Sequence, residues 1–142
     1  MANALYDTGR NAFLQGSINW LNAPIRAQLV SIANLPTAYV FNASLDTVFA
    51  SVPTGARVGF SAPSLGTKTA TAGIADAADT VFTAVSGPTV GAILLFVSTA
   101  TANASDWQLI AYIDTATGEP VGPNGGDITA QWDNTANKIF KL

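Results

Sequence analysis

The sequence contains no histidine and no cysteine, and among its 142 residues only six are basic and nine acidic. Histidine and cysteine supply most groups that titrate, bind metals or act as nucleophiles near neutral pH. Their absence excludes Ser–His and Cys–His nucleophile pairs, and it leaves only carboxylates for a zinc site. Charged residues make up 11% of the chain, against about 25% in an average globular protein. We therefore expect a protein that is not an enzyme, binds no cofactor, and associates through its surface.

Long apolar runs and clustered basic residues are also missing. The longest apolar run covers residues 92–97, well short of the roughly 20 residues that a membrane helix needs. The first residues lack the basic and apolar regions of a secretory signal. With a net charge of −3 and scattered basic residues, nucleic acid is not an expected partner. These features predict a soluble chain with no membrane partner. Its mean hydropathy of +0.31 indicates apolar surface that is buried in a core or an interface.

Carboxylates are the remaining candidates for chemistry, because glycoside hydrolysis needs only two acids. The pairs closest in sequence are Asp114 with Glu119, Asp127 with Asp133, and Asp76 with Asp79. All lie in or beside predicted turns, where aspartate is favoured because it hydrogen-bonds the nearby backbone. We predict such turn roles, with a calcium site formed by the first pair and Asp127 as the alternative.

Residues 3–16 have the spacing of an amphipathic helix. Signals for its two ends are provided by Asn3 as the N-cap, Asp7 in the first turn and Gly16 as the stop. One apolar stripe is predicted from Tyr6, Phe13, Leu14 and the stem of Arg10. This stripe packs either on the helix's own domain or on a neighbouring subunit.

From residue 17 onward the apolar period changes to two, and short extended runs alternate with turn residues. The predicted strands cover residues 25–32, 37–41, 56–60, 68–74, 80–85, 90–98, 107–113, 127–132 and 138–142, with a helical turn at 45–52 capped by Ser44. The continuous run 90–98 is typical of a central strand buried on both faces. We predict one mainly β domain over residues 1–142. It consists of an N-terminal α-helix within 1–16 and a single antiparallel β-sandwich or jelly roll over 17–142.

Aromatic and apolar residues near the two ends are the candidates for contacts with other subunits. Trp20, Trp107 and Trp132 each lie next to Asn or Asp, and they suit a core, an interface or a sugar platform. The apolar C-terminal run 139–142 either pairs within its own sheet or reaches a neighbour. The predicted interface residues are Tyr6, Arg10, Phe13, Trp107, Trp132, Ile139, Phe140 and Leu142.

Several stretches resemble small structural proteins encoded in the late regions of tailed bacteriophages. The resembling stretches are residues 1–7, 9–14, 109–118, 120–121, 123–128, 132–134 and 139–142. Residues 37–78 depart from this pattern. The resemblance is strongest in the first 15 and the last 35 residues.

The resemblance implies a virion structural protein, most similar to a capsid cement (decoration) protein. Its implied partners are the major capsid protein and further copies of the chain in a homodimer or homotrimer. Its implied location is the phage capsid surface, after assembly in the host cytoplasm. Two alternatives stay open: a tail-fibre or spike module that binds host glycans through Trp107 or Trp132, and a tail-tube or connector subunit.

Overall fold

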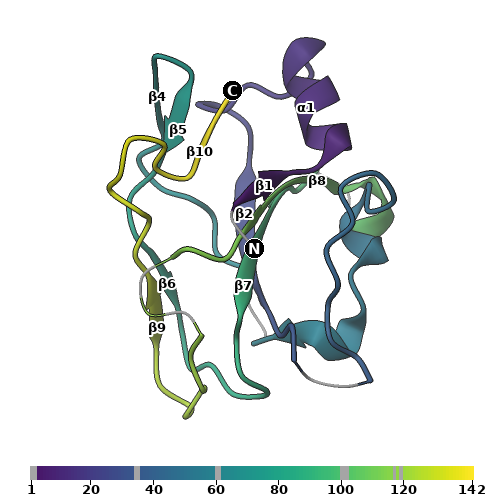
Figure 1. Ribbon diagram of the computed structural model, residues 1–142, viewed down its shortest axis with the longest axis vertical. Helices are drawn as coiled ribbons and strands as arrows, with labels where there is room; N and C mark the ends of the chain where they lie inside the picture. The colour runs from purple at the N-terminus through teal and green to yellow at the C-terminus, as the bar shows by residue number, and fades with distance from the viewer. Residues whose placement is uncertain (1–2, 34–35, 60–61, 100–102, 117, 119) are drawn as a thin grey trace.

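The computed structural model describes residues 3–33, 36–59, 62–99, 103–116, 118 and 120–142 (Figure 1). In this part the chain is mainly β, with antiparallel sheets and one α-helix, as the sequence predicted. The helix α1 spans Asp7–Leu14. The strands are β1 (Ala4–Leu5), β2 (Ile25–Val30), β3 (Arg57–Val58), β4 (Thr69–Thr71), β5 (Ile74–Asp76), β6 (Thr80–Phe82), β7 (Ala92–Val97), β8 (Gln108–Ile113), β9 (Ile128–Ala130) and β10 (Phe140–Lys141). The short 3₁₀ turns are η1 (Phe49–Ser51), η2 (Thr54–Ala56) and η3 (Ala104–Asp106).

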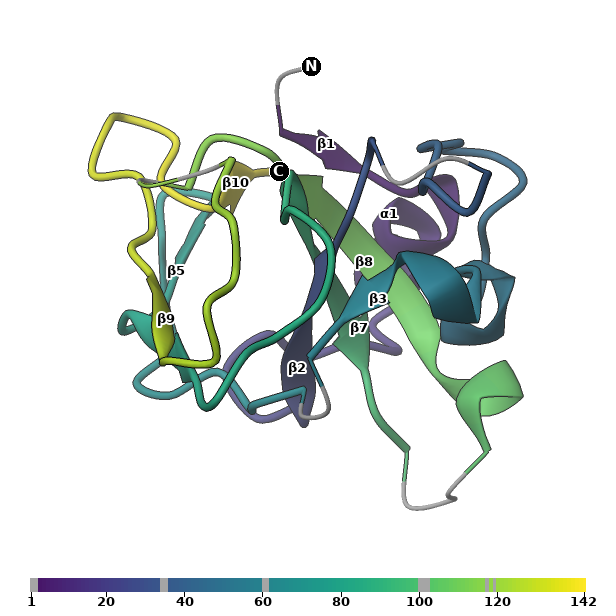
Figure 2. The ribbon, with the colours of Figure 1, turned by 90° about the horizontal axis from the view of Figure 1, so that it is seen from below.

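The strands form three sheets in two layers. The largest sheet has the order β1-β8-β7-β2-β3, and the smaller ones have the orders β10-β5-β4 and β6-β9. The neighbouring strands pair antiparallel throughout. Figure 2 shows β2, β7 and β8 on one side and β5, β9 and β10 on the other. The main core lies between these layers, because it draws buried residues from both.

Strand β7 is the central strand that its apolar run predicts. It pairs with β2 on one side and with β8 on the other, and five of its six residues are buried. Ile93 and Leu95 belong to the main core. Leu94 and Phe96 face a second core on the opposite side of the sheet, which residues 39–56 help to cover. A strand buried on both faces needs this second cover.

The helix packs on a β-bulge in the largest sheet. In the β7–β8 register, Leu95 faces Ala111 and Phe96 faces Leu109, which leaves Ile110 as the extra residue. The carbonyl oxygen of Ile110 accepts a hydrogen bond from the Tyr6 backbone N–H at 3.0 Å. The helix then approaches so closely that a Cβ on Gly9, in its first turn, would lie 2.7 Å from the same oxygen.

The start of the helix differs from the prediction of residues 3–16. The helix begins at Asp7, because Ala4 and Leu5 pair with β8 as strand β1. Asn3 is not the N-cap, a position that Tyr6 occupies without a side-chain hydrogen bond. The predicted stop is confirmed, since Gly16 follows the C-cap residue with a φ of +70°.

The predicted apolar stripe holds in part. Tyr6 is buried in the second core and Phe13 packs against the main core, whereas Leu14 is 86% exposed and Arg10 lies on the surface. The buried positions of the helix itself are Gly9 and Ala12. The close approach to the bulge explains the difference, because only small side chains fit between the helix and the sheet.

Two further segments differ from the sequence prediction. The single strand predicted at 68–74 is a hairpin, in which β4 and β5 are joined by Ala72 and Gly73 at φ values of 54° and 77°. Positive φ at both positions is typical of a type I′ turn, but its usual Asn-Gly signal is missing here. Residues 37–41 form no strand, and the turn predicted at 45–52 is the 3₁₀ turn η1, with Val48 rather than Ser44 at its N-cap.

We predict that Gly9→Ala destabilises the fold, although alanine is the better helix former by about 1 kcal/mol. The added Cβ would force the helix away from Ile110, so the free energy of unfolding should fall by about 1–3 kcal/mol in denaturant titrations. Asn11→Ala, at an exposed position of the same helix, is the control and should change it by less than about 0.5 kcal/mol. Equal stability of the Gly9 variant and the control would contradict the close packing of the helix on Ile110.

Candidate interaction surface

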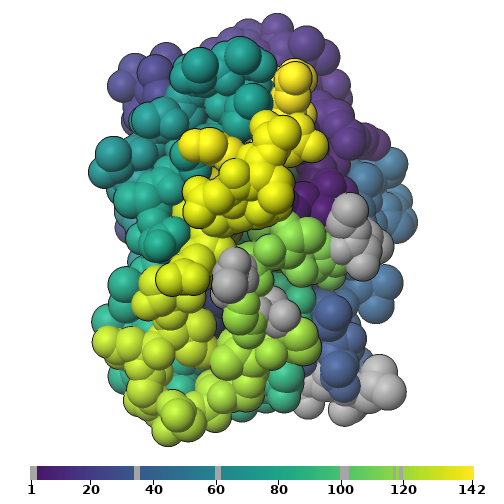
Figure 3. All heavy atoms as spheres, turned by 60° about the vertical axis from the view of Figure 1, so that its left-hand side comes forward, coloured from purple at the N-terminus to yellow at the C-terminus, as the bar shows by residue number. Residues whose placement is uncertain are grey.

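Three predicted contact residues come together where α1 lies beside the C-terminal strand. Arg10, Phe13 and Leu142 line one hollow of about 370 Å³. The other residues that line it are Leu5, Leu14 and Lys141. We call these six residues the α1/β10 surface. Figure 3 shows the C-terminal segment lying against the N-terminal segment on this face of the molecule.

Large apolar side chains of this surface are open to water. Leu14 is 86% exposed and Leu142 is 60% exposed. Phe13 is half-buried, and its ring centroid lies 5.8 Å from that of Phe140. Phe140 in turn makes an edge-to-face contact with Trp20 at 5.2 Å. The aromatic contacts therefore connect the surface to the main core, while the two leucines remain available for another molecule.

Basic side chains surround these leucines. Arg10 pairs with Asp7 at 2.8 Å, and Lys141 makes no ion pair within the described part of the chain. A second hollow of about 410 Å³ shares Leu5, Arg10 and Lys141 with the first and is also lined by Lys138. Three of the six basic residues of a chain with net charge −3 thus border the two hollows. Asp133 also lines the second hollow, and Lys138 pairs with Asp76 as Arg10 does with Asp7. Lys141 is therefore the basic side chain best placed to meet an acidic group of a partner.

The Asn3 side chain joins the two terminal strands beneath this surface. Its Nδ2 donates to the Ile139 carbonyl oxygen at 3.2 Å. Its Oδ1 accepts from the Asp114 backbone N–H at 3.2 Å and from the Thr115 hydroxyl at 2.8 Å. No local pattern in the sequence predicts this role, because the side chain bonds residues more than a hundred positions away.

The C-terminal run 139–142 pairs within its own sheet, which was one of the two outcomes left open by the sequence. Phe140 lies opposite Ala75 in the β10–β5 ladder. Ile139 is 1% exposed and Phe140 7%, so both predicted contact residues belong to the main core. Only Leu142, at the end of the run, is exposed.

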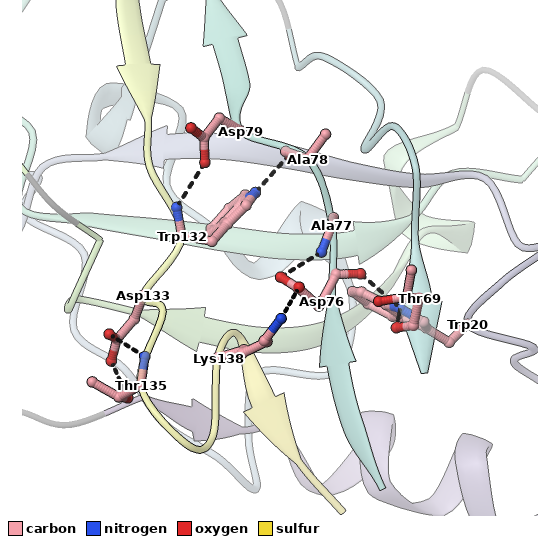
Figure 4. Close-up of polar contacts among 10 residues, drawn as sticks. All are labelled: Trp20, Thr69, Asp76, Ala77, Ala78, Asp79, Trp132, Asp133, Thr135 and Lys138. Atoms are coloured by element: carbon pink, nitrogen blue, oxygen red, sulfur yellow. Dashed lines mark hydrogen bonds and ion pairs between the residues drawn. The ribbon is translucent and has the colours of Figure 1, made fainter. Parts of the chain in front are cut away.

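Two tryptophans hydrogen-bond the β4–β5 hairpin and the segment that follows it (Figure 4). Trp132 donates its indole N–H to the Ala78 carbonyl oxygen at 3.0 Å, and its backbone N–H donates to Asp79 at 3.3 Å. The Trp20 indole N–H donates to the carbonyl oxygens of Thr69 and Asp76 at 2.9 and 3.3 Å. Both indoles are buried and belong to the main core. Their burial and their hydrogen bonds give both tryptophans a structural role.

The last two predicted contact residues lie around the second core. Tyr6 is fully buried, and its hydroxyl shares a hydrogen bond with that of Tyr39, which donates to Asp46 at 2.7 Å. Burial raises the pKa of Tyr6 and of Tyr39 well above the ordinary value. Burial also raises the pKa of Tyr112, with a smaller contribution from the charge of Asp114. Trp107 is half-buried and lines a hollow distinct from the α1/β10 surface.

The carboxylates have structural partners. Asp133 accepts from the Thr135 hydroxyl and backbone N–H at 2.7 and 3.0 Å, and these hydrogen bonds lower the pKa of Asp133. Asp76 accepts from the Ala77 backbone N–H at 2.9 Å and pairs with Lys138 (Figure 4). These contacts confirm a turn role for Asp133, whereas Asp76 is the last residue of β5 and is held by Lys138. Glu119, named in the calcium alternative, lies outside the described residues, and the described residues include no group of three possible metal-binding side chains.

No protein-family model and no curated protein matches the chain. In the described residues, no helix combines the length and the apolar character needed to cross a membrane.

We predict that no tyrosine of the folded protein ionises near the ordinary pKa of about 10. All three tyrosines have a raised pKa in the folded state. Their contribution to stability is therefore fully present below about pH 10 and is lost as the pH rises above it, since the unfolded chain releases the protons first. Phenolate absorbance should rise at a higher pH in the folded protein than in the unfolded chain, with circular dichroism showing which of the two is present. A phenolate step near pH 10 in a folded protein would exclude this arrangement.

Proposed function

We propose that the chain is a non-catalytic structural protein of a tailed-phage virion, a cement protein that binds neighbouring major capsid subunits. The observation that carries the proposal is the α1/β10 surface. Its exposed leucines and basic side chains come from residues 5–14 and 141–142, which overlap or adjoin the terminal stretches that resemble phage structural proteins. A surface built from both ends of a small shell protein is suited to reach across a seam between subunits.

The mechanism needs buried area rather than a reaction. Packed DNA pushes a phage capsid outward, and the seams between subunits resist through many weak contacts. A rigid domain across a seam adds apolar burial worth about 25 cal/mol per Å². Many identical copies on a symmetric shell turn a modest affinity at one site into high avidity. A dimer or trimer on a local symmetry axis fits this use.

The rigid body in this proposal is a β-sandwich. The five-stranded sheet would form one layer, and the two smaller sheets the other, with the main core between them. The strand order β1-β8-β7-β2-β3 offers no specific support for the jelly-roll alternative.

The glycan-binding alternative has less support at one of its two tryptophans. Trp132 is 3% exposed and donates its indole N–H to Ala78, so it is not positioned to stack on a sugar. Trp107 is half-buried beside an open hollow. A role for Trp107 does not compete with the α1/β10 surface, because the two hollows share no lining residue.

We expect Leu14→Ser and Leu142→Ser to weaken binding to capsids without unfolding the protein, since both side chains are mostly exposed. Each should lower the affinity for capsids stripped of the protein, measured by co-sedimentation, by about tenfold. The matched control is Val81→Ser, which removes a 46% exposed apolar side chain from β6.

Unchanged capsid binding by both leucine variants, or an equal loss in the Val81 control, would rule out the α1/β10 surface as the contact. Point substitutions are needed here, because deleting the segment after Trp132 would remove Ile139 and Phe140 from the core and unfold the chain.

A further inference from the structure

A third hollow, of about 420 Å³, opens beside the second core, where β2, β3 and η1 meet the start of β8. It is lined by Arg26, Gln28, Phe49, Thr54, Arg57, Gly59, Ala62 and Trp107. We call it the Trp107 hollow. Its volume lies within the roughly 300–1,000 Å³ of small-molecule sites, and the cement proposal makes no use of it.

An aromatic stack forms one wall of the Trp107 hollow. The ring of Trp107 lies nearly parallel to that of Phe96, with centroids 5.5 Å apart and an angle of 14°. Phe96 also stacks on Phe49, at 4.3 Å and 24°. Phe96 is fully buried, so the stack holds the indole in place while the half-buried Trp107 still borders open space. A fixed, partly open aromatic ring suits the apolar face of a flat or ring-shaped ligand.

Two arginines give the hollow a positive charge. Arg57 is held in place, because its Nη2 donates to the carbonyl oxygens of Phe49 and Val52 at 3.0 and 2.8 Å. Its guanidinium carbon lies 4.2 Å from the centre of the Phe49 ring. Arg26 is exposed on β2. The described lining includes no acidic residue, and neither arginine forms an ion pair with a described carboxylate.

The positive charge of Arg57 is only partly solvated. Burial lowers the pKa of Arg57, which is the effect of a guanidinium that has lost water without gaining a carboxylate partner. A bound anion would supply that partner. Arginine is the side chain best matched to a carboxylate, because its planar fork can make two parallel hydrogen bonds.

We propose that the Trp107 hollow binds an acidic saccharide, with its ring packed on Trp107 and its carboxylate paired with Arg26 and Arg57. The combination of one aromatic platform and two unpaired guanidinium groups selects a ring that carries a negative charge over a neutral ring. The inference is independent of the cement proposal, since the hollow has no residue in common with the α1/β10 surface.

The test is titration calorimetry of the purified chain with glucuronate, N-acetylneuraminate, glucose and a nucleoside monophosphate. At least one acid should bind with a dissociation constant of about 1 mM or below, and glucose, which has the ring of glucuronate without its carboxylate, at least about tenfold more weakly. The two acids distinguish a uronate site from a sialate site. Binding should also weaken as salt is added.

Arg26→Gln should weaken binding of the acid by about tenfold or more, and it removes an exposed side chain without touching the core. Lys141→Gln is the matched control. It removes the same charge from the α1/β10 surface and should leave saccharide binding unchanged. Circular dichroism checks that both variants remain folded.

Four results would overturn the proposal: no binding of either acid at about 10 mM, equal binding of glucose and glucuronate, wild-type affinity in Arg26→Gln, or tighter binding of a nucleoside monophosphate than of both acids. None of these results bears on the cement proposal, which would still be judged by capsid binding.

Discussion

The fold depends on burying strand β7 on both of its faces. Its six residues are apolar, and the side chains alternate between two cores on opposite sides of the largest sheet. One core is closed by the layer that contains β5, β6, β9 and β10. The other is closed by residues 39–56 together with Tyr6, which places a buried tyrosine pair and an aromatic stack on that side. A single sheet with one open face could not accommodate this strand.

Strand β8 and its bulge position both ends of the chain. The bulge at Ile110 turns its carbonyl oxygen toward Tyr6, and the helix lies on the bulge through Gly9. Strand β1 pairs with β8 before the helix begins, and the Asn3 amide reaches β10. The two ends are therefore fixed side by side. Because small residues take the inner face of the helix, Leu14 is exposed and Phe13 is only half-buried, and this is the physical origin of the α1/β10 surface.

The sequence predicted the elements whose signals are local and missed those that depend on distant partners. The continuous apolar run of β7, the strand pattern of β2 and the stop at Gly16 are confirmed. The two-residue strand β1 was missed because its partner lies more than a hundred positions away. Apolar character alone also does not separate a core residue from an interface residue. Of the eight predicted contact residues, Tyr6, Trp132, Ile139 and Phe140 are in the chain's own core, and Arg10, Phe13, Trp107 and Leu142 have open surface.

A chain with so few reactive groups acts, in this account, by contact at many equivalent positions. The most direct test is the number of copies of this chain in a purified virus particle, measured by quantitative mass spectrometry against the major capsid protein. The account predicts copies on the order of hundreds, in a fixed ratio to the capsid subunits of a symmetric shell. Absence from the particle, or a few tens of copies or fewer, would contradict it.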